Sequence, residues 1–333
     1  MTETVGPPSP RGKKLRLVHG QLRGRPTLAT WQLSRCGAAD CVVCEHSAEA
    51  GLDWMPLEQV ERVAERLGQL GTLVVRLSGG ADPFMHPDLP GVVAALAGGH
   101  LPEVVSHGWM VTRERARRVW QAGLVSARVP LRSADPGRHD ARVGLAGAHA
   151  RAVAALRVLA EERAQSWQGV SVSMALDAEA DVAEVEAMLK LAQPLGVRVE
   201  LESCPTDGAG APANGLGRGL IDLKRRAQRL ESSLAYLARV DQALSGGVPG
   251  CQAGKLSFHI DYRGHVWRCA DPQGARVEGG SLLEDGTRGA LARIRELGAL
   301  DGCRRCWRSE RGEVESLRTW RGLGEAIAGW IWR

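Results

Sequence analysis

The stretch Arg35-Cys36-Gly37-Ala38-Ala39-Asp40-Cys41-Val42-Val43-Cys44 decides how the fold of this chain is interpreted. It follows residues 28–33, an apolar run with the composition of a buried strand, which places its three cysteines in a loop at a strand end. Thiolates select zinc or iron–sulfur clusters. Three close cysteines without a fourth favour a cluster with one open iron, whereas His46 would complete a tetrahedral zinc site, so both alternatives stay open.

Composition limits the class of protein. The chain has 333 residues, 44% hydrophobic and 24% charged, which is typical of a soluble protein with one large domain and a small one. Its net charge of +5 forms no long basic stripe, so we expect no nucleic-acid partner. Without a signal-peptide pattern or an apolar run of about 18 residues, we expect a cytoplasmic protein that does not bind membranes. There, eight cysteines indicate metal ligands or catalytic groups rather than disulfides.

Apolar, β-branched runs alternate with helical patterns after a first segment, 1–26, that is rich in Pro, Gly, Arg and Lys and predicts a flexible N-terminal arm. The predicted strands are residues 28–33, 72–77, 103–106, 125–131, 169–176 and 197–201, and the predicted helices are residues 56–70, 87–98, 112–122, 148–165 and 180–195. Such an order predicts a parallel sheet with right-handed crossovers. Six units are too few for a closed eightfold barrel, so residues 27–219 are predicted to form an α/β domain, a partial (β/α)6 TIM-like barrel.

The segment 31–48 resembles the cluster loop of radical SAM enzymes, a superfamily that binds a [4Fe-4S] cluster through C-x3-C-x2-C and S-adenosylmethionine on its open iron. Here the spacing is C-x4-C-x2-C, so the second and third cysteines match, the first lies one residue early, and Gly37 falls on the first family position. Glu45 stands where an aromatic residue is usual. The resemblance implies the same partial barrel and a cluster bound by Cys36, Cys41 and Cys44.

A glycine-rich turn follows the second predicted strand. Glycines at a strand end let backbone amides approach a ligand, although a plain tight turn explains the pattern equally well. Gly80-Ala81-Asp82-Pro83 resembles the family's G-G-E-P motif, which holds the methionyl amino group, with Asp82 in the role of the glutamate. At the next strand end, residues 106–108 resemble the family's S-T-N-G turn. The resemblance implies cofactor binding by Gly79, Gly80, Ala81, Asp82 and Ser106.

The fourth unit resembles two further family stretches, S-L-D-G and H-D-x-x-R-G, but Pro130 and Arg132 replace the serine and the aspartate of the first. His107 and His139 are candidates for catalysis, yet a lone histidine is more often a packing or surface residue, and no catalytic residue is assigned. Cys204 is best explained as a small buried residue.

A second cysteine group begins at Cys251. The alternation around residues 256–268 predicts a β-hairpin that brings Cys251 towards Cys269, and a C-x2-C pair follows at residues 303–306. Four cysteines suit either a structural zinc site or an iron–sulfur cluster. Residues 251–307 resemble a shortened SPASM or twitch extension, a small cysteine-rich C-terminal iron–sulfur domain. The resemblance implies one auxiliary [4Fe-4S] cluster bound by Cys251, Cys269, Cys303 and Cys306.

Two further segments complete the predicted organisation. Residues 220–250 are expected to connect the domains, with one long helix over about residues 220–244. Residues 308–333 are expected to form a C-terminal helix that packs on the barrel.

The resemblance implies an enzyme that cleaves S-adenosylmethionine reductively and abstracts a hydrogen atom from its substrate. A peptide or small molecule would be that substrate, with a ribosomally made peptide preferred, and flavodoxin or ferredoxin would be the reductant. Two alternatives accompany it. The departures at Cys36, Asp82, Pro130 and Arg132 would also suit a degenerate binding protein without turnover, and the cysteines would also suit a zinc-binding structural protein.

Overall fold

The computed structural model describes residues 11–35, 53–177, 180–203, 215–269, 278–284, 288–290, 292–293, 307–316 and 324. Within them, one sheet has the strand order β6-β5-β4-β3-β2-β1-β7-β8-β9. Strands β1 to β7 pair in parallel with their neighbours among them, β8 pairs antiparallel with β7, and β9 pairs antiparallel with β8. Their bounds are β1 Leu28–Trp31, β2 Val74–Leu77, β3 Leu101–Val105, β4 Ser126–Leu131, β5 Gly169–Leu176, β6 Arg198–Ser203, β7 Ser257–Ile260, β8 His265–Trp267 and β9 Glu278–Ser281.

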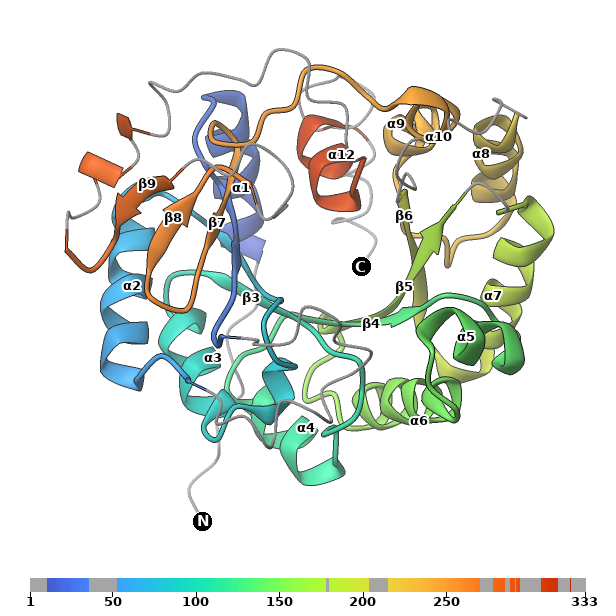
Figure 1. The fold of residues 1–333 in the computed structure, drawn as a ribbon, viewed down its shortest axis with the longest axis horizontal. Helices are drawn as coiled ribbons and strands as arrows, with labels where there is room; N and C mark the ends of the chain where they lie inside the picture. Colours follow the sequence, from blue (N-terminus) through green and yellow to red (C-terminus); the bar gives the residue numbers. More distant parts are fainter. Residues whose placement is uncertain are drawn as a thin grey trace.

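Helices cover the convex side of this curved sheet (Figure 1). They are α2 Leu57–Leu70, α3 Leu89–Ala97, α4 Arg113–Gln121, α5 Pro136–Val143, α6 Ala148–Glu161, α7 Val182–Leu195 and α8 Leu216–Arg226. Helix α2 illustrates why they form: Val60, Val63 and Leu67 recur at helical spacing and are fully buried, and Gly71 ends the helix at φ 80°. The six predicted strands and the first five predicted helices are confirmed, and the architecture is a partial TIM-like barrel.

The predicted hairpin forms, but it belongs to the barrel sheet. Strand β7 pairs in parallel with β1, with Thr30 opposite His259, and the Gln32 N–H donates to the Ile260 carbonyl over 2.9 Å. This pairing supplies partners for the edge of β1 that β2 leaves open.

Two expectations about helices are wrong. Residues 11–22, expected within a flexible arm, form helix α1 (Arg11–Leu22), and its Lys13 Nζ donates to the carbonyls of Ala97 and His100. The single long helix expected over residues 220–244 is broken into α8, α9 (Leu234–Leu237) and α10 (Val240–Gly246). The cause is the edge of β6: Val199 exchanges backbone hydrogen bonds with Arg229 and Glu231, so the intervening chain is extended.

Helix α12 (Ser309–Ser316) lies on the concave side, between the two limbs of the sheet (Figure 1). It confirms the first part of the predicted C-terminal helix, and residues 317–323 and 325–333 lie outside the described chain. Val314 belongs to one buried apolar cluster with Leu28, Val74 and Leu101, the first residues of β1, β2 and β3. None of the described helices is long and apolar enough to cross a membrane alone, and α5 with α6 passes that test only as a pair bent by 108°.

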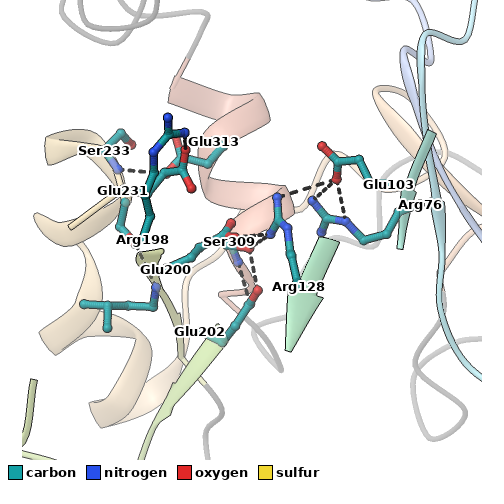
Figure 2. A network of polar contacts seen from close by, with 12 residues as sticks. Arg76, Glu103, Arg128, Arg198, Glu200, Glu202, Glu231, Ser233, Ser309 and Glu313 are labelled. Carbon is teal, nitrogen blue, oxygen red and sulfur yellow. Dashed lines mark hydrogen bonds and ion pairs between the residues drawn. The ribbon is translucent and has the colours of Figure 1, made fainter. Parts of the chain in front are cut away.

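Charged side chains from neighbouring strands form a ladder across the concave face (Figure 2). Arg76 Nε and Nη2 donate to Glu103 Oε2 over 2.9 and 2.8 Å, and Arg128 pairs with Glu103 at 3.5 Å and with Glu200. The side chains of Arg76 and Glu200 are only 4% exposed. Removing one member of such a buried pair leaves an uncompensated charge, so the ladder is costly to break.

The ladder continues onto α12 through two carboxylates. The Ser309 backbone N–H donates to Glu202 Oε2 over 2.8 Å, and Ser309 Oγ donates to Glu202 Oε1 over 2.5 Å. The Ser233 N–H donates to Glu313 Oε1 over 2.8 Å. Burial, with a smaller contribution from the charges of Glu200 and Glu231, raises the pKa of Glu313 to about 7 against the opposing hydrogen bonds from Ser233.

The stability of this arrangement is expected to fall as the pH rises. An unfolded glutamate has a pKa of 4.5 and Glu313 one of about 7, so the folded state binds more protons between these values and loses stability through that window. Replacing Glu313→Gln removes this pH dependence, so the free energy of unfolding of the variant should rise by about 3 kcal/mol relative to that of the wild type between pH 4.5 and pH 8.

Urea denaturation at several pH values measures this difference. Glu61→Gln, a change of the same kind at an exposed position on α2, is the control and should follow the wild type. A Glu313→Gln profile parallel to that of the wild type would contradict the raised pKa.

Candidate functional site

The described residues on either side of the first cysteine group pair with each other at the C-terminal end of β1. Residues 33–35 pair with residues 53–55: the Met55 N–H donates to the Leu33 carbonyl over 3.2 Å, and Ser34 and Trp54 form an antiparallel bridge. Cys36, Cys41 and Cys44 lie outside the described residues. Both ends of their segment are therefore fixed at the edge of the sheet where parallel α/β folds carry their chemistry.

The glycine turn after β2 packs on the start of that segment. Gly79 and Gly80 have φ of 90° and 68°, the left-handed region that favours glycine. A Cβ on Gly80 would lie 2.2 Å from the Ser34 carbonyl oxygen, and the Ala81 N–H donates to Ser34 Oγ over 2.9 Å. Three of the predicted cofactor-binding residues thus lie directly beside the base of the cysteine segment.

Asp82 joins this turn to the end of β3. Its Oδ1 accepts the Phe84 N–H over 2.9 Å and so caps the short 3-10 helix η1 (Pro83–Met85). Its Oδ2 accepts Ser106 Oγ–H over 2.8 Å and the His107 N–H over 2.7 Å. The carboxylate is nearly buried, and these donors fix its orientation. The predicted residues Asp82 and Ser106 are therefore in contact.

His139, on helix α5 after β4, is a packing residue. It is 3% exposed, its Nδ1 accepts the Arg132 N–H over 2.9 Å, and its ring contacts that of His149 edge to face at 5.6 Å. Burial and the neighbouring His149 lower the pKa of His139 to about 4, so it is neutral at pH 7. Asp140 accepts the N–H groups of Gly147 and His149 and thereby holds the start of α6. His107, by contrast, has an exposed side chain at the strand ends.

Two cysteines of the second group face one space. Cys251 and Cys269 line a cavity of about 80 Å³ between β1, β7 and α12. Cys303 and Cys306 lie outside the described residues, as does Cys204. Arg308, which follows Cys306 by two residues in the sequence, lines the same cavity.

The described residues contain no group of three His, Cys, Asp or Glu side chains arranged to hold a metal ion. Five of the seven predicted ligands lie outside the described chain, so both predicted cysteine sites stay predictions. The buried charge ladder was not predicted from the sequence. Its signal was present as Arg76, Glu103, Arg128 and Glu200, charged residues inside otherwise apolar strands.

Comparison with known proteins places the fold. No protein-family model and no curated protein sequence matches the chain. Among solved structures, SuiB from Streptococcus suis bound to S-adenosylmethionine matches with a TM-score of 0.59 at 12% identity, over 79% of this chain and 64% of SuiB. SuiB bound to its precursor peptide SuiA matches with a TM-score of 0.60 at 11% identity, over 94% of this chain and 77% of SuiB. The enzyme anSMEcpe with bound AdoMet and Cp18Cys peptide gives 0.58 at 11% identity, over 81% of each chain.

These matches are to radical SAM enzymes, and the chain has their fold. At 11–12% identity the likeness concerns the fold alone.

The close approach at Gly80 can be tested by substitution. Gly80→Ala should lower the free energy of unfolding by on the order of 2 kcal/mol, because the new Cβ meets the Ser34 carbonyl and the backbone has positive φ. Gly98→Ala is the control, since Gly98 has φ of −59° and open space around a Cβ, and it should leave stability unchanged or raise it by up to about 1 kcal/mol. Equal urea midpoints for the two variants would show that the turn and Ser34 are not in contact.

Proposed function

We propose that the protein is a radical SAM enzyme that binds S-adenosylmethionine at the C-terminal ends of β1 to β3 and modifies a peptide. The observation that carries the proposal is the contact between the Gly79–Asp82 turn and Ser34, at the base of the segment that holds Cys36, Cys41 and Cys44. The fold supports it, and so do the solved structures of SuiB with SuiA and of anSMEcpe with Cp18Cys peptide.

The residues present suit the proposed ligands. Three thiolates and no fourth close cysteine form the donor set of a [4Fe-4S] cluster with one open iron. When bound, such a cluster supplies the electron for reductive cleavage of S-adenosylmethionine. Gly80 lets the backbone lie where a side chain would not fit, and Asp82 offers a carboxylate held by three donors.

The role of the chain is therefore to bind and orient. The Asp82 carboxylate would accept a hydrogen bond from the ammonium group of the cofactor, and its ties to Ser106 and His107 fix its direction before binding, which lowers the entropic cost of ordering the site. At the other end of the concave face, Cys251, Cys269, Cys303 and Cys306 would hold an auxiliary cluster beside the barrel. A small one-electron carrier such as flavodoxin or ferredoxin would supply the electrons.

One observation favours a second function, a binding protein without turnover. The Asp82 carboxylate already holds three donors from the chain, and it is one methylene shorter than the glutamate of the family motif. In this alternative the same carboxylate only stabilises the turn.

Formation of 5′-deoxyadenosine separates the two functions. Anaerobically reconstituted protein with dithionite and S-adenosylmethionine should form it, and Cys44→Ala should not. Asp82→Asn keeps an oxygen for the Phe84 N–H but removes the charge and puts an amide NH2 where Oδ2 accepted the His107 N–H. It should weaken S-adenosylmethionine binding at least about tenfold, since a hydrogen bond to a charged group contributes about 1.5–3 kcal/mol.

Asp88→Asn is the matched control, because Asp88 caps α3 in the same way through the Gly91 N–H. It should bind the cofactor as the wild type does. Iron-loaded wild type that forms no 5′-deoxyadenosine would refute turnover, and equal affinities of the two asparagine variants would refute the role of Asp82.

A further inference from the structure

Arg311 of α12 lies where several parts of the C-terminal region meet. Its side chain is nearly buried, at 9% exposed. Nη2 donates to the Pro249 carbonyl over 2.9 Å, and Nε donates to Glu315 Oε1 over 2.8 Å. The guanidinium carbon lies 5.2 Å from the centroid of the Trp307 ring, within the range of a cation–π contact. Arg311 is thus held from three directions.

These contacts fall on the segments that carry the second cysteine group. Pro249 precedes Cys251 by two residues, and Trp307 directly follows Cys306. Arg311 also lines the cavity that both Cys251 and Cys269 face. One side chain therefore contacts two of the three cysteine-bearing segments and shares a cavity with the third.

Arginine side chains contribute to the lining of the cavity. Among the described residues that line it are Arg268, Arg308 and Arg311, together with Glu315, which pairs with Arg311. Thiolates bound to a metal centre remain anionic as a group, and an anionic centre is stabilised by a nearby fixed cation, most of all where water is scarce. Arg311 would therefore act on a bound group through both position and charge.

We propose that Arg311 is a positioning residue for the C-terminal cysteine site: it ties the Cys251 segment to the chain after Cys306 and stabilises the negative charge of the group the cysteines bind. The proposal rests on the auxiliary cluster of the proposed function. It adds a residue outside the ligand set that determines how firmly the group is held and how readily it is reduced.

Helix α12 has other anchors, so a change at Arg311 should leave it in place. Ser309 donates twice to Glu202 on β6, and Glu313 accepts the Ser233 N–H. Trp307 stacks on Tyr236 with 5.7 Å between ring centroids, and its Nε1–H donates to the Tyr236 carbonyl over 3.0 Å. Variants at Arg311 can therefore be compared as folded full-length chains.

The test uses the full chain with Cys36, Cys41 and Cys44 replaced by alanine, so that bound iron belongs to the C-terminal site. In this parent, Arg311→Met removes tether and charge, Arg311→Lys keeps the charge, and Arg163→Met is the control. Arg163 also donates to backbone carbonyls, those of Ala160 and Gln168, but on the α6–β5 connection. The measurements are iron release to a chelator and the reduction potential from an anaerobic titration followed by EPR.

Arg311→Met should release iron about 10- to 100-fold faster than the parent, the range for loss of a residue that supports metal ligands. Its reduction potential should shift to more negative values, because the added electron meets less positive charge. Arg311→Lys should restore the potential more fully than the iron retention, since a lysine lacks the forked donors that reach Pro249 and Glu315 together.

The outcomes separate this proposal from the one on which it rests. If the parent binds iron and Arg311→Met matches Arg163→Met in both measurements, the role of Arg311 is wrong and the auxiliary cluster stands. If the parent binds no iron at its C-terminal cysteines, the auxiliary cluster is wrong, and the role of Arg311 falls with it.

Discussion

The candidate site depends on one close approach, between the Ser34 carbonyl and Gly80. The chain can pass there only because Gly80 lacks a side chain, and the neighbouring Ala81 N–H bonds to Ser34 Oγ. This contact sets the turn after β2 against the start of the cysteine segment. Asp82 extends the same frame to the end of β3 through Ser106 and His107. A ligand at this edge would meet groups whose positions are already fixed.

Contacts on the concave face of the sheet hold the C-terminal helix α12 in place. Charged side chains from β2, β3, β4 and β6 compensate one another there, and α12 joins them through Ser309 and Glu202 (Figure 2). Helix α12 begins three residues after Cys306 in the sequence, and β7, which follows Cys251, pairs with β1. The described parts of the chain that adjoin the two predicted cysteine groups are therefore joined to the same sheet.

The sequence predicted what local periodicity encodes. Helix α2 was predicted to within one residue, because Val60, Val63 and Leu67 recur at helical spacing and form its buried face. Features that depend on distant partners were missed. Residues 220–244 are helical in pattern, but the open edge of β6 draws part of them into backbone pairing with Val199. Helix α1 has little amphipathic character, and its Lys13 is held by carbonyls more than eighty residues away. Within the site, the family resemblance assigned Asp82 and Ser106 to the same ligand. The hydrogen bonds that Asp82 accepts from Phe84, Ser106 and His107 could be identified only from the folded structure.

The most direct test of the central claim is EPR of the reduced, anaerobically purified protein, with iron and sulfide counted in the same sample, before and after addition of S-adenosylmethionine. Two four-iron clusters, one with an open iron, predict about eight irons per chain and a signal that changes when the cofactor binds. About four irons and a signal that does not respond to S-adenosylmethionine would contradict the account, because cofactor binding at the strand ends would then be absent.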